Sequence, residues 1–191
     1  KMLFYNGERV MGNITAFILG KLKLKVNKDK SAVERTWKRK FIGFTLNLMF
    51  GKACSSISKQ SLKRHKEKLI NILSRSKPIP LEQRINKLNQ VNIGWVNYYG
   101  IAKCKGILGQ LDTWIRQRLR MCIWKQWKKV RTRYRNLKKL GLTHYQAIKF
   151  TNTRKGYWRI ANSGILNTTL TNQFFTDLAL KSLTRQYIKI H

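Results

Sequence analysis

The chain of 191 residues contains 41 lysines and arginines but 7 aspartates and glutamates, which gives a formal net charge of +34 at pH 7. Its 42% hydrophobic residues suffice for a core, so the composition excludes wholesale disorder, and the length fits one or two domains. No apolar run reaches the roughly 18 residues of a transmembrane helix, and the charge favours a nucleic-acid-binding surface over an anionic lipid surface.

The first fifty residues have a mixed pattern. Apolar residues spaced by three and four predict an amphipathic helix from Glu8 to Leu22. Short runs with strand-like patterns follow at residues 22–26, 31–33 and 41–50. This opening part is therefore expected to be α+β.

From Ser58 onward the pattern becomes helical. Ser58 is placed to N-cap a first helix, and Pro78 and Pro80 end that helix and start a second one. A third helix carries apolar residues from Leu108 to Ile123. Three antiparallel helices are the simplest arrangement of these elements.

The last third of the chain is basic and rich in turn-forming residues. We expect a basic connection over 128–139, a short helix capped by Thr143, and a last apolar helix from about Leu170 to Ile188. Together they predict a small helical module after residue 130. The expected fold is mainly α with a small α+β N-terminal part, made of a helix and a hairpin, followed by a three-helix bundle.

Residues that carry catalytic chemistry are sparse. The seven carboxylates form no adjacent or one-apart pair, so a two-metal phosphoryl-transfer centre is not expected in this chain. The histidines are scattered, and His65, on a lysine-rich helix, is expected to face solvent or phosphate. The three cysteines form no CxxC pair, which predicts no zinc or disulfide framework and a reducing compartment. We therefore predict no catalytic residue, no metal site and no cofactor.

The stretch "GWVNYYG" at residues 94–100 is either a packing seam between helices or an aromatic platform for bases. On a helix, Trp95 and Tyr99 lie one turn apart and continue the apolar face of the second helix, which predicts burial of Trp95 in the core. Asn97 and Tyr98 fall on the other side, next to basic residues, where they are placed to meet ribose or phosphate.

Basic residues on polar helix faces are the candidate nucleic-acid contacts, because like-charge repulsion is tolerated where a polyanion supplies the counter-charge. A solvated face without a ligand is the alternative interpretation. The stretch "RKGYWR" at residues 154–159 adds two aromatics, a pattern suited to stacking on single strands, with Trp158 the expected core member. The candidate RNA- and DNA-binding residues are Lys38, Arg39, Lys40, Lys63, Arg64, Lys68, Asn97, Tyr98, Arg116, Arg120, Lys125, Lys128, Lys129, Arg131, Arg133, Arg154, Lys155, Tyr157 and Arg159.

Three segments, in order, resemble the C-terminal half of group II intron reverse transcriptases and maturases. "LKLKVNKDKSAVERTWKRKFIGFTLN" is similar to that family's last two polymerase blocks. The stretch from "SISKQSLKRHKEKLINILSRS" through "GWVNYY" to "LDTWIRQRLRMCIWKQWKK" resembles its maturase-specific X domain, which serves as the polymerase thumb. "TRKGYWRIANSGILNTTLTNQFF" resembles the DNA-binding region of compact bacterial members.

The resemblance implies three parts: the end of the polymerase palm at residues 1–57, the thumb or X domain at 58–129, and a DNA-binding region at 130–191. The family's Tyr-x-Asp-Asp catalytic block is absent from the sequence, as are the zinc and HNH signatures of longer members. The chain by itself is therefore not expected to polymerise DNA, and Mg²⁺ is expected only for the missing polymerase site and for the RNA.

The implied partners are group II intron RNA, a DNA target or template-primer, and a separate or missing N-terminal polymerase half, with no membrane. The implied function is to help the intron fold for splicing and to clamp template and primer during intron mobility. The absence of a secretory signal pattern argues against secretion and favours the bacterial cytoplasm, near the nucleoid, or an organelle. The alternative is a stand-alone basic structural RNA-binding protein of ribosomal or nucleoid type.

Overall fold

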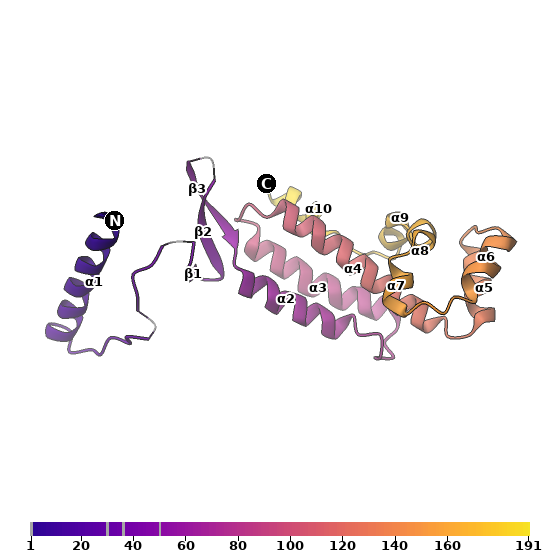
Figure 1. Cartoon of the computed structure of the whole chain (residues 1–191), viewed down its shortest axis with the longest axis horizontal. Helices are drawn as coiled ribbons and strands as arrows, with labels where there is room; N and C mark the ends of the chain where they lie inside the picture. Colours follow the sequence, from indigo (N-terminus) through magenta and orange to yellow (C-terminus); the bar gives the residue numbers. More distant parts are fainter. Residues whose placement is uncertain (1, 30, 36, 50) are drawn as a thin grey trace. The chain divides into compact units, whose positions relative to one another are not determined.

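The computed structural model describes residues 2–29, 31–35, 37–49 and 51–191. The chain divides into two compact units, residues 1–58 and residues 59–191, which are described separately. Both follow the predicted fold class: the first unit contains a helix and a small sheet, and the second is helical (Figure 1).

The first unit contains α1 (Met2–Gly20), β1 (Lys40–Phe41), β2 (Phe44–Met49) and β3 (Lys52–Ile57). The strands form an antiparallel sheet in the order β1-β2-β3. The helix confirms the predicted amphipathic segment. The strand-like runs at 22–26 and 31–33 are wrong as strands, because the described residues there lie outside regular secondary structure.

The turn between β1 and β2 has positive φ at both central residues, 49° at Ile42 and 86° at Gly43. This geometry matches the right-handed twist of the two flanking strands in a two-residue hairpin. The backbone amide of Ser58, just before the second unit, donates to the Gly43 carbonyl at 3.0 Å. The end of β3 is therefore tied back to the hairpin.

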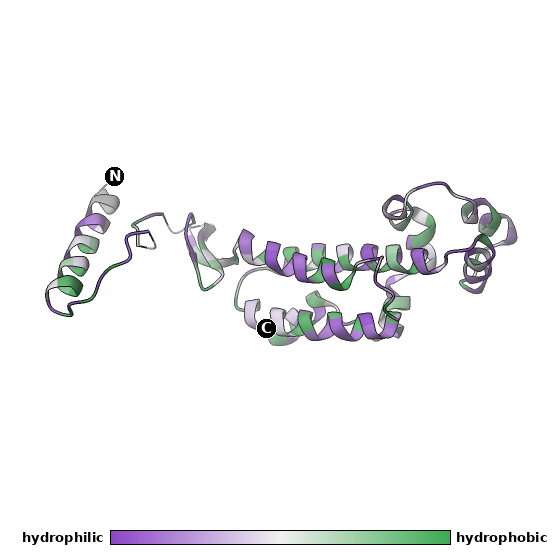
Figure 2. Cartoon of the chain, turned by 90° about the horizontal axis from the view of Figure 1, so that it is seen from below, coloured by the Kyte–Doolittle hydropathy of each residue, from purple (hydrophilic) through white to green (hydrophobic). Residues whose placement is uncertain are grey.

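The second unit is built around α2 (Lys59–Ile72), α3 (Leu81–Tyr99) and α4 (Lys105–Gln126), which confirms the three predicted bundle helices. Their core contains fully buried leucines from all three helices, including Leu69, Leu88 and Leu119. Figure 2 shows hydrophobic and hydrophilic residues alternating along these helices, as expected for amphipathic elements.

The remaining helices of this unit are α5 (Val130–Lys139), α6 (His144–Thr151), α7 (Tyr157–Ala161), α8 (Gly164–Thr169), α9 (Asn172–Asp177) and α10 (Leu183–Ile190). Helix α7 packs against α4, α5 packs against α6, and α10 packs against both α3 and α4. Thr143 caps α6 through a capping box with Gln146, as predicted. The supposed connection over 128–139 is instead mostly the helix α5.

The single apolar helix predicted from Leu170 to Ile188 is wrong, because the chain turns between α9 and α10. Ala179 adopts a left-handed conformation with φ of 62°. The buried Asn89 of α3 holds this turn: its side-chain amide donates to the Ala179 carbonyl at 2.8 Å, and its oxygen accepts from the Lys181 amide at 2.9 Å. A polar residue on a distant helix therefore decides where the last helix begins.

Asp112 of α4 fixes the other side of that junction. Its buried carboxylate accepts hydrogen bonds from the Ser182 hydroxyl at 2.7 Å, the Leu183 amide at 2.9 Å and the Thr184 amide at 3.1 Å. A carboxylate is favourable at a helix N-terminus because the first amides of the helix lack intrahelical partners. Asp112 thereby anchors α10 on α4.

Arg84 performs the equivalent task at the end of α2. Its buried guanidinium donates to the carbonyls of Ile72, Ser74 and Lys77, the last two at 3.1 Å. Carbonyls at a helix C-terminus have no intrahelical donor, so a buried cation satisfies them. The loop between α2 and α3 is thus held by the first turn of α3.

Candidate nucleic-acid interface

The second unit has many cations and few carboxylates to neutralise them. Its acidic residues are Glu67, Glu82, Asp112 and Asp177. Asp112 is occupied by the α10 amides and hydroxyls, and Asp177 accepts from the Gln173 side chain at 2.7 Å. Within the described residues 59–191, no lysine or arginine pairs with a carboxylate. These basic faces therefore retain their charge for an external polyanion.

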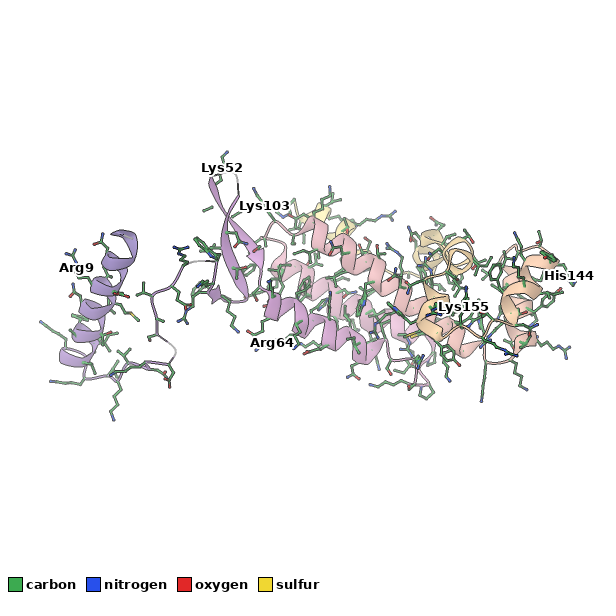
Figure 3. The ribbon with its side chains drawn as sticks, viewed as in Figure 1. Arg9, Lys52, Arg64, Lys103, His144 and Lys155 are labelled. Atoms are coloured by element: carbon green, nitrogen blue, oxygen red, sulfur yellow. The ribbon has the colours of Figure 1, made fainter. Side chains whose placement is uncertain are left out.

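The outer face of α2 is a predicted basic face that is open to solvent. Lys63, Arg64 and Lys68 are exposed, and Arg64 extends from the outside of the helix (Figure 3). Lysine and arginine on such a face can neutralise successive phosphates along a nucleic-acid strand. Their exposure is as expected, and their contact with RNA stays a prediction.

The polar side of α4 is different, because helices from the end of the chain cover part of it. Arg120 is only 6% exposed, and its Nε and Nη2 donate to the Leu170 carbonyl at 3.0 and 2.8 Å. The same guanidinium lies over the Phe175 ring, 5.6 Å from its centroid. Burial, and then the nearby Arg116 charge, lower the pKa of Arg120. The prediction of Arg120 as a surface RNA contact is wrong: it holds the α8–α9 turn.

Arg116 lies one turn before Arg120 and remains half-buried. One of its guanidinium nitrogens lies 3.3 Å from the Thr113 hydroxyl, and the side chain lines two shallow hollows beside Asn172.

Arg133 is a second predicted contact that serves the fold. Its Nε donates to the Trp127 carbonyl at 2.9 Å, and the guanidinium lies 4.7 Å from the Trp124 ring centroid. The side chain therefore joins α5 to the end of α4. Arg133 is half-buried, and its contact with nucleic acid stays a prediction.

Tyr157 is also engaged within the protein. The Arg75 guanidinium carbon lies 4.8 Å, and the Lys125 ammonium nitrogen 5.1 Å, from the ring centroid. Both cations are attracted by the π-electrons of the ring. Lys125 and Tyr157 are half-buried, so neither presents a fully open surface for stacking on a base.

Around α7, the exposure of Trp158 and the contacts of Arg118 differ from the sequence-based prediction. Trp158 is 43% exposed, so its expected place in the core is wrong. The Arg118 guanidinium carbon lies 5.7 Å from the ring centroid of Trp158 and 4.8 Å from the ring centroid of Trp114. Sequence reasoning missed Arg118; its four-residue spacing from Trp114 on one helix was the available signal.

The other predicted cations are exposed. In the first unit, Lys38 and Lys40 are exposed, and Arg39 pairs with Glu34 at 2.9 Å, a surface ion pair that contributes little to stability. In the second unit, the exposed candidates are Lys128, Lys129, Arg131, Arg154, Lys155 and Arg159. Figure 3 places Lys155 in the segment that leads into α7.

The motif on α3 is neither a simple seam nor a bare platform. Val96 and Asn92 point into the bundle and are buried, whereas Trp95 is only half-buried. The Trp95 ring stacks on His65 of α2, with centroids 4.2 Å apart and an interplanar angle of 11°. The prediction of Trp95 as a core residue is therefore wrong, because in the last two turns of α3 the buried positions are Asn92 and Val96, one residue after Val91 and Trp95.

His65 is 3% exposed, which corrects the expectation that it faces solvent or phosphate. Burial lowers the pKa of His65 to about 4, although the Asn92 side chain acts to raise it; the Lys68 charge lowers it further. The imidazole is therefore neutral at pH 7. A neutral flat ring supports Trp95 without adding charge beneath it.

A groove with a volume of about 450 Å³ lies between α2 and α3. Arg64, His65 and Lys68 line it from α2, and Gly94 and Trp95 are among the lining residues of α3. At Gly94, an added Cβ would meet no atom within 4 Å, so the groove is open above this position. The groove therefore combines aromatic surface, cations and free space in one place.

Asn97 and Tyr98 extend the motif toward the surface. Tyr98 is 46% exposed, lines the same groove and packs edge-on against Tyr99, with centroids 4.8 Å apart. Asn97 is exposed and its oxygen accepts from the Gln186 side chain of α10 at 3.2 Å. Tyr98 is thus positioned for a ligand in the groove, whereas Asn97 lies toward α10.

In a comparison with known protein families, the central part of the chain matches one family model. Residues 62–141 match the model of the group II intron maturase-specific domain, so they span most of α2, all of α3, α4 and α5, and every residue that lines the groove except Ser61. None of the curated proteins compared with the chain matches it. Among the described helices, none combines the length and the apolar character required to cross a membrane.

Proposed function

We infer that this chain, whose residues 62–141 match the group II intron maturase-specific domain, binds group II intron RNA through the basic faces of its second unit and helps that RNA fold for splicing. The match to this domain supports a maturase role in group II intron splicing. The RNA contacts are the finer part of the proposal. Their support is the open basic face of α2 and the cations that lack carboxylate partners.

The observation that carries the proposal is the location of the matched domain. It contains the exposed Arg64 and Lys68 of α2, the half-buried Trp95 of α3 and the half-buried Arg116 of α4. A large RNA such as an intron folds against strong phosphate repulsion, which a rigid cationic protein surface reduces. The protein therefore acts by stabilising the folded RNA, and the RNA supplies the splicing chemistry.

The test is splicing of the group II intron transcribed from the same locus, at a Mg²⁺ concentration where the RNA alone reacts slowly. We expect the full chain to accelerate splicing, and we expect intron RNA to be bound more tightly than a fully paired RNA duplex of equal length at about 150 mM salt. Equal affinity for both RNAs, without acceleration, would establish the alternative of a general basic structural RNA-binding protein.

The proposal extends to intron mobility, in which the chain would hold template and primer beside a polymerase half. Apolar side chains of α1 support it: Val10 is 51%, Ile14 49% and Phe17 55% exposed, a face suited to packing against further protein. Primer extension with Mg²⁺ tests this part. We expect DNA synthesis when a polymerase half is present together with the chain and none from the purified chain alone; incorporation by the purified chain would contradict it.

Because the partner is intron RNA, the proposed location is the compartment where introns are transcribed, either the bacterial cytoplasm near the nucleoid or an organelle.

A further inference from the structure

The groove between α2 and α3 has a composition that the purely basic faces lack. Its floor is aromatic, since Trp95 lies stacked on the buried His65, and Tyr98 stands at its edge. Arg64 and Lys68, one turn apart on α2, line its other side, and none of the lining residues is acidic. The cations can bind a phosphate, and the aromatic rings can stack on a planar base.

We propose that this groove binds one unpaired nucleotide of the RNA, with the base against Trp95 and Tyr98 and the adjoining phosphate at Arg64 and Lys68. The proposal deepens the proposed function and rests on it, because it names the element of the RNA that the maturase domain reads. A fully paired helix keeps its bases stacked inside the duplex. The groove therefore selects a bulged or looped-out nucleotide.

The size and the chemistry of the groove fit this occupant. Its volume of about 450 Å³ lies in the range of roughly 300–1,000 Å³ that is typical of sites for small ligands. Protein recognition of RNA sequence uses unstacked bases that lie on aromatic side chains, with arginine and lysine at the backbone. The absence of carboxylates from the lining excludes repulsion of the phosphate.

His65 acts as a positioning residue for Trp95. Parallel stacking at 4.2 Å holds the indole in one orientation before any ligand arrives. A ring that is already ordered loses less conformational entropy when a base binds to it. The neutral imidazole also lets a base approach without changing the charge of the floor.

Gly94 makes the proposal testable without damaging the fold. It lines the groove, and an added Cβ at this position meets no atom within 4 Å, so Gly94→Leu introduces its bulk on the open side of the helix, in the groove. Replacing a helical glycine also favours the helix. The matched control is Gly106→Leu on α4, where an added Cβ likewise meets nothing within 4 Å.

The probe is an RNA hairpin with a single 2-aminopurine bulge, compared with the same hairpin fully paired, at 200 mM salt. The wild-type chain and Gly106→Leu are expected to prefer the bulged hairpin by about tenfold and to quench the 2-aminopurine, since base stacking on an aromatic side chain changes affinity by a factor of roughly 5 to 150. Gly94→Leu is expected to bind both hairpins equally and to leave the fluorescence unquenched.

A wild-type chain without preference for the bulge, or a Gly94→Leu variant that retains it, would overturn the proposal. The outcomes separate it from the proposed function. Preference for intron RNA without preference for the bulge would leave the maturase role intact and eliminate the nucleotide site. Preference for the bulge without preference for intron RNA would retain the nucleotide site and eliminate the maturase role.

Discussion

The outer face of α2 and the polar side of α4 both carry cations one helical turn apart, but the surroundings of the two faces differ in the fold. On α2, Arg64 and Lys68 remain open to solvent beside the groove. On α4, Arg120 is enclosed by the α8–α9 turn and donates to the Leu170 carbonyl. A basic helix face therefore indicates a ligand only where no later segment of the chain covers it.

The largest expected difference between the two faces is in stability. Arg120→Ala removes the donors of the Leu170 carbonyl and the contact with Phe175, and we expect it to cost roughly 2–4 kcal/mol, because a buried hydrogen bond to a charged group is lost and a buried carbonyl is left unpaired. Arg64→Ala, on the open face, should stay within about 0.5 kcal/mol. Urea unfolding of both variants measures this, and equal stabilities would show that the α4 face is not enclosed.

The second prediction concerns the floor of the α2–α3 groove. The unfolded chain binds a proton at His65 near pH 6.5, whereas the folded chain binds it only near pH 4. Stability from this residue is therefore fully present above about pH 6.5 and is lost as the pH falls toward 4. Between pH 7.5 and pH 5, the loss should be about 2 kcal/mol.

His65→Phe is the control, since it keeps a flat ring under Trp95 but cannot titrate. Urea unfolding at the two pH values should show a smaller pH dependence for His65→Phe than for the wild type, by about that amount. The same pH dependence in both proteins would mean that His65 is protonated as easily in the folded chain as in the unfolded one.

The smallest effect on stability, with a clear effect on binding, is expected from the open face itself. The double change Arg64→Ala and Lys68→Ala should leave stability within about 1 kcal/mol, because both side chains are exposed. It should lower the slope of log affinity against log salt by roughly two, as expected for two lost phosphate contacts.

The matched control removes the same charge from exposed residues of the first unit, Lys25→Ala and Lys28→Ala. A salt titration of RNA affinity compares the two double variants. If the control lowers the slope as much as the α2 variant does, net charge alone accounts for binding, and the α2 face has no special role.

Much of the helical framework could be predicted from local patterns. Prolines 78 and 80 mark the start of α3, which begins at Leu81, and Thr143 caps α6 as its hydroxyl and spacing predict. The third strand, β3, was not anticipated, because its small and polar residues have no alternating apolar pattern. Ser56 and Thr45 join it to β2 by a side-chain hydrogen bond of 2.9 Å, which only strand pairing creates.

The candidate site was predictable in composition but not in arrangement. The motif at residues 94–100 pointed to aromatic function, yet Trp95 was assigned to the core because its spacing from the buried Leu88 suits a helix face. Burial changes gradually from the centre of a helix face to its edge, so residue spacing alone cannot distinguish a buried position from a half-buried one. His65, on another helix, decides the outcome by stacking on Trp95.

The net charge, the three bundle helices and the resemblance to group II intron maturases follow from residue type and from spacing within one segment. The tertiary structure decided which cations serve the fold and which face a ligand. Asp112 and Arg120 form hydrogen bonds with backbone groups far along the sequence, and Arg84 bonds to the loop that follows α2. Their roles therefore depend on contacts that no local pattern encodes. Burial of a charge requires partners, and only the folded chain supplies them.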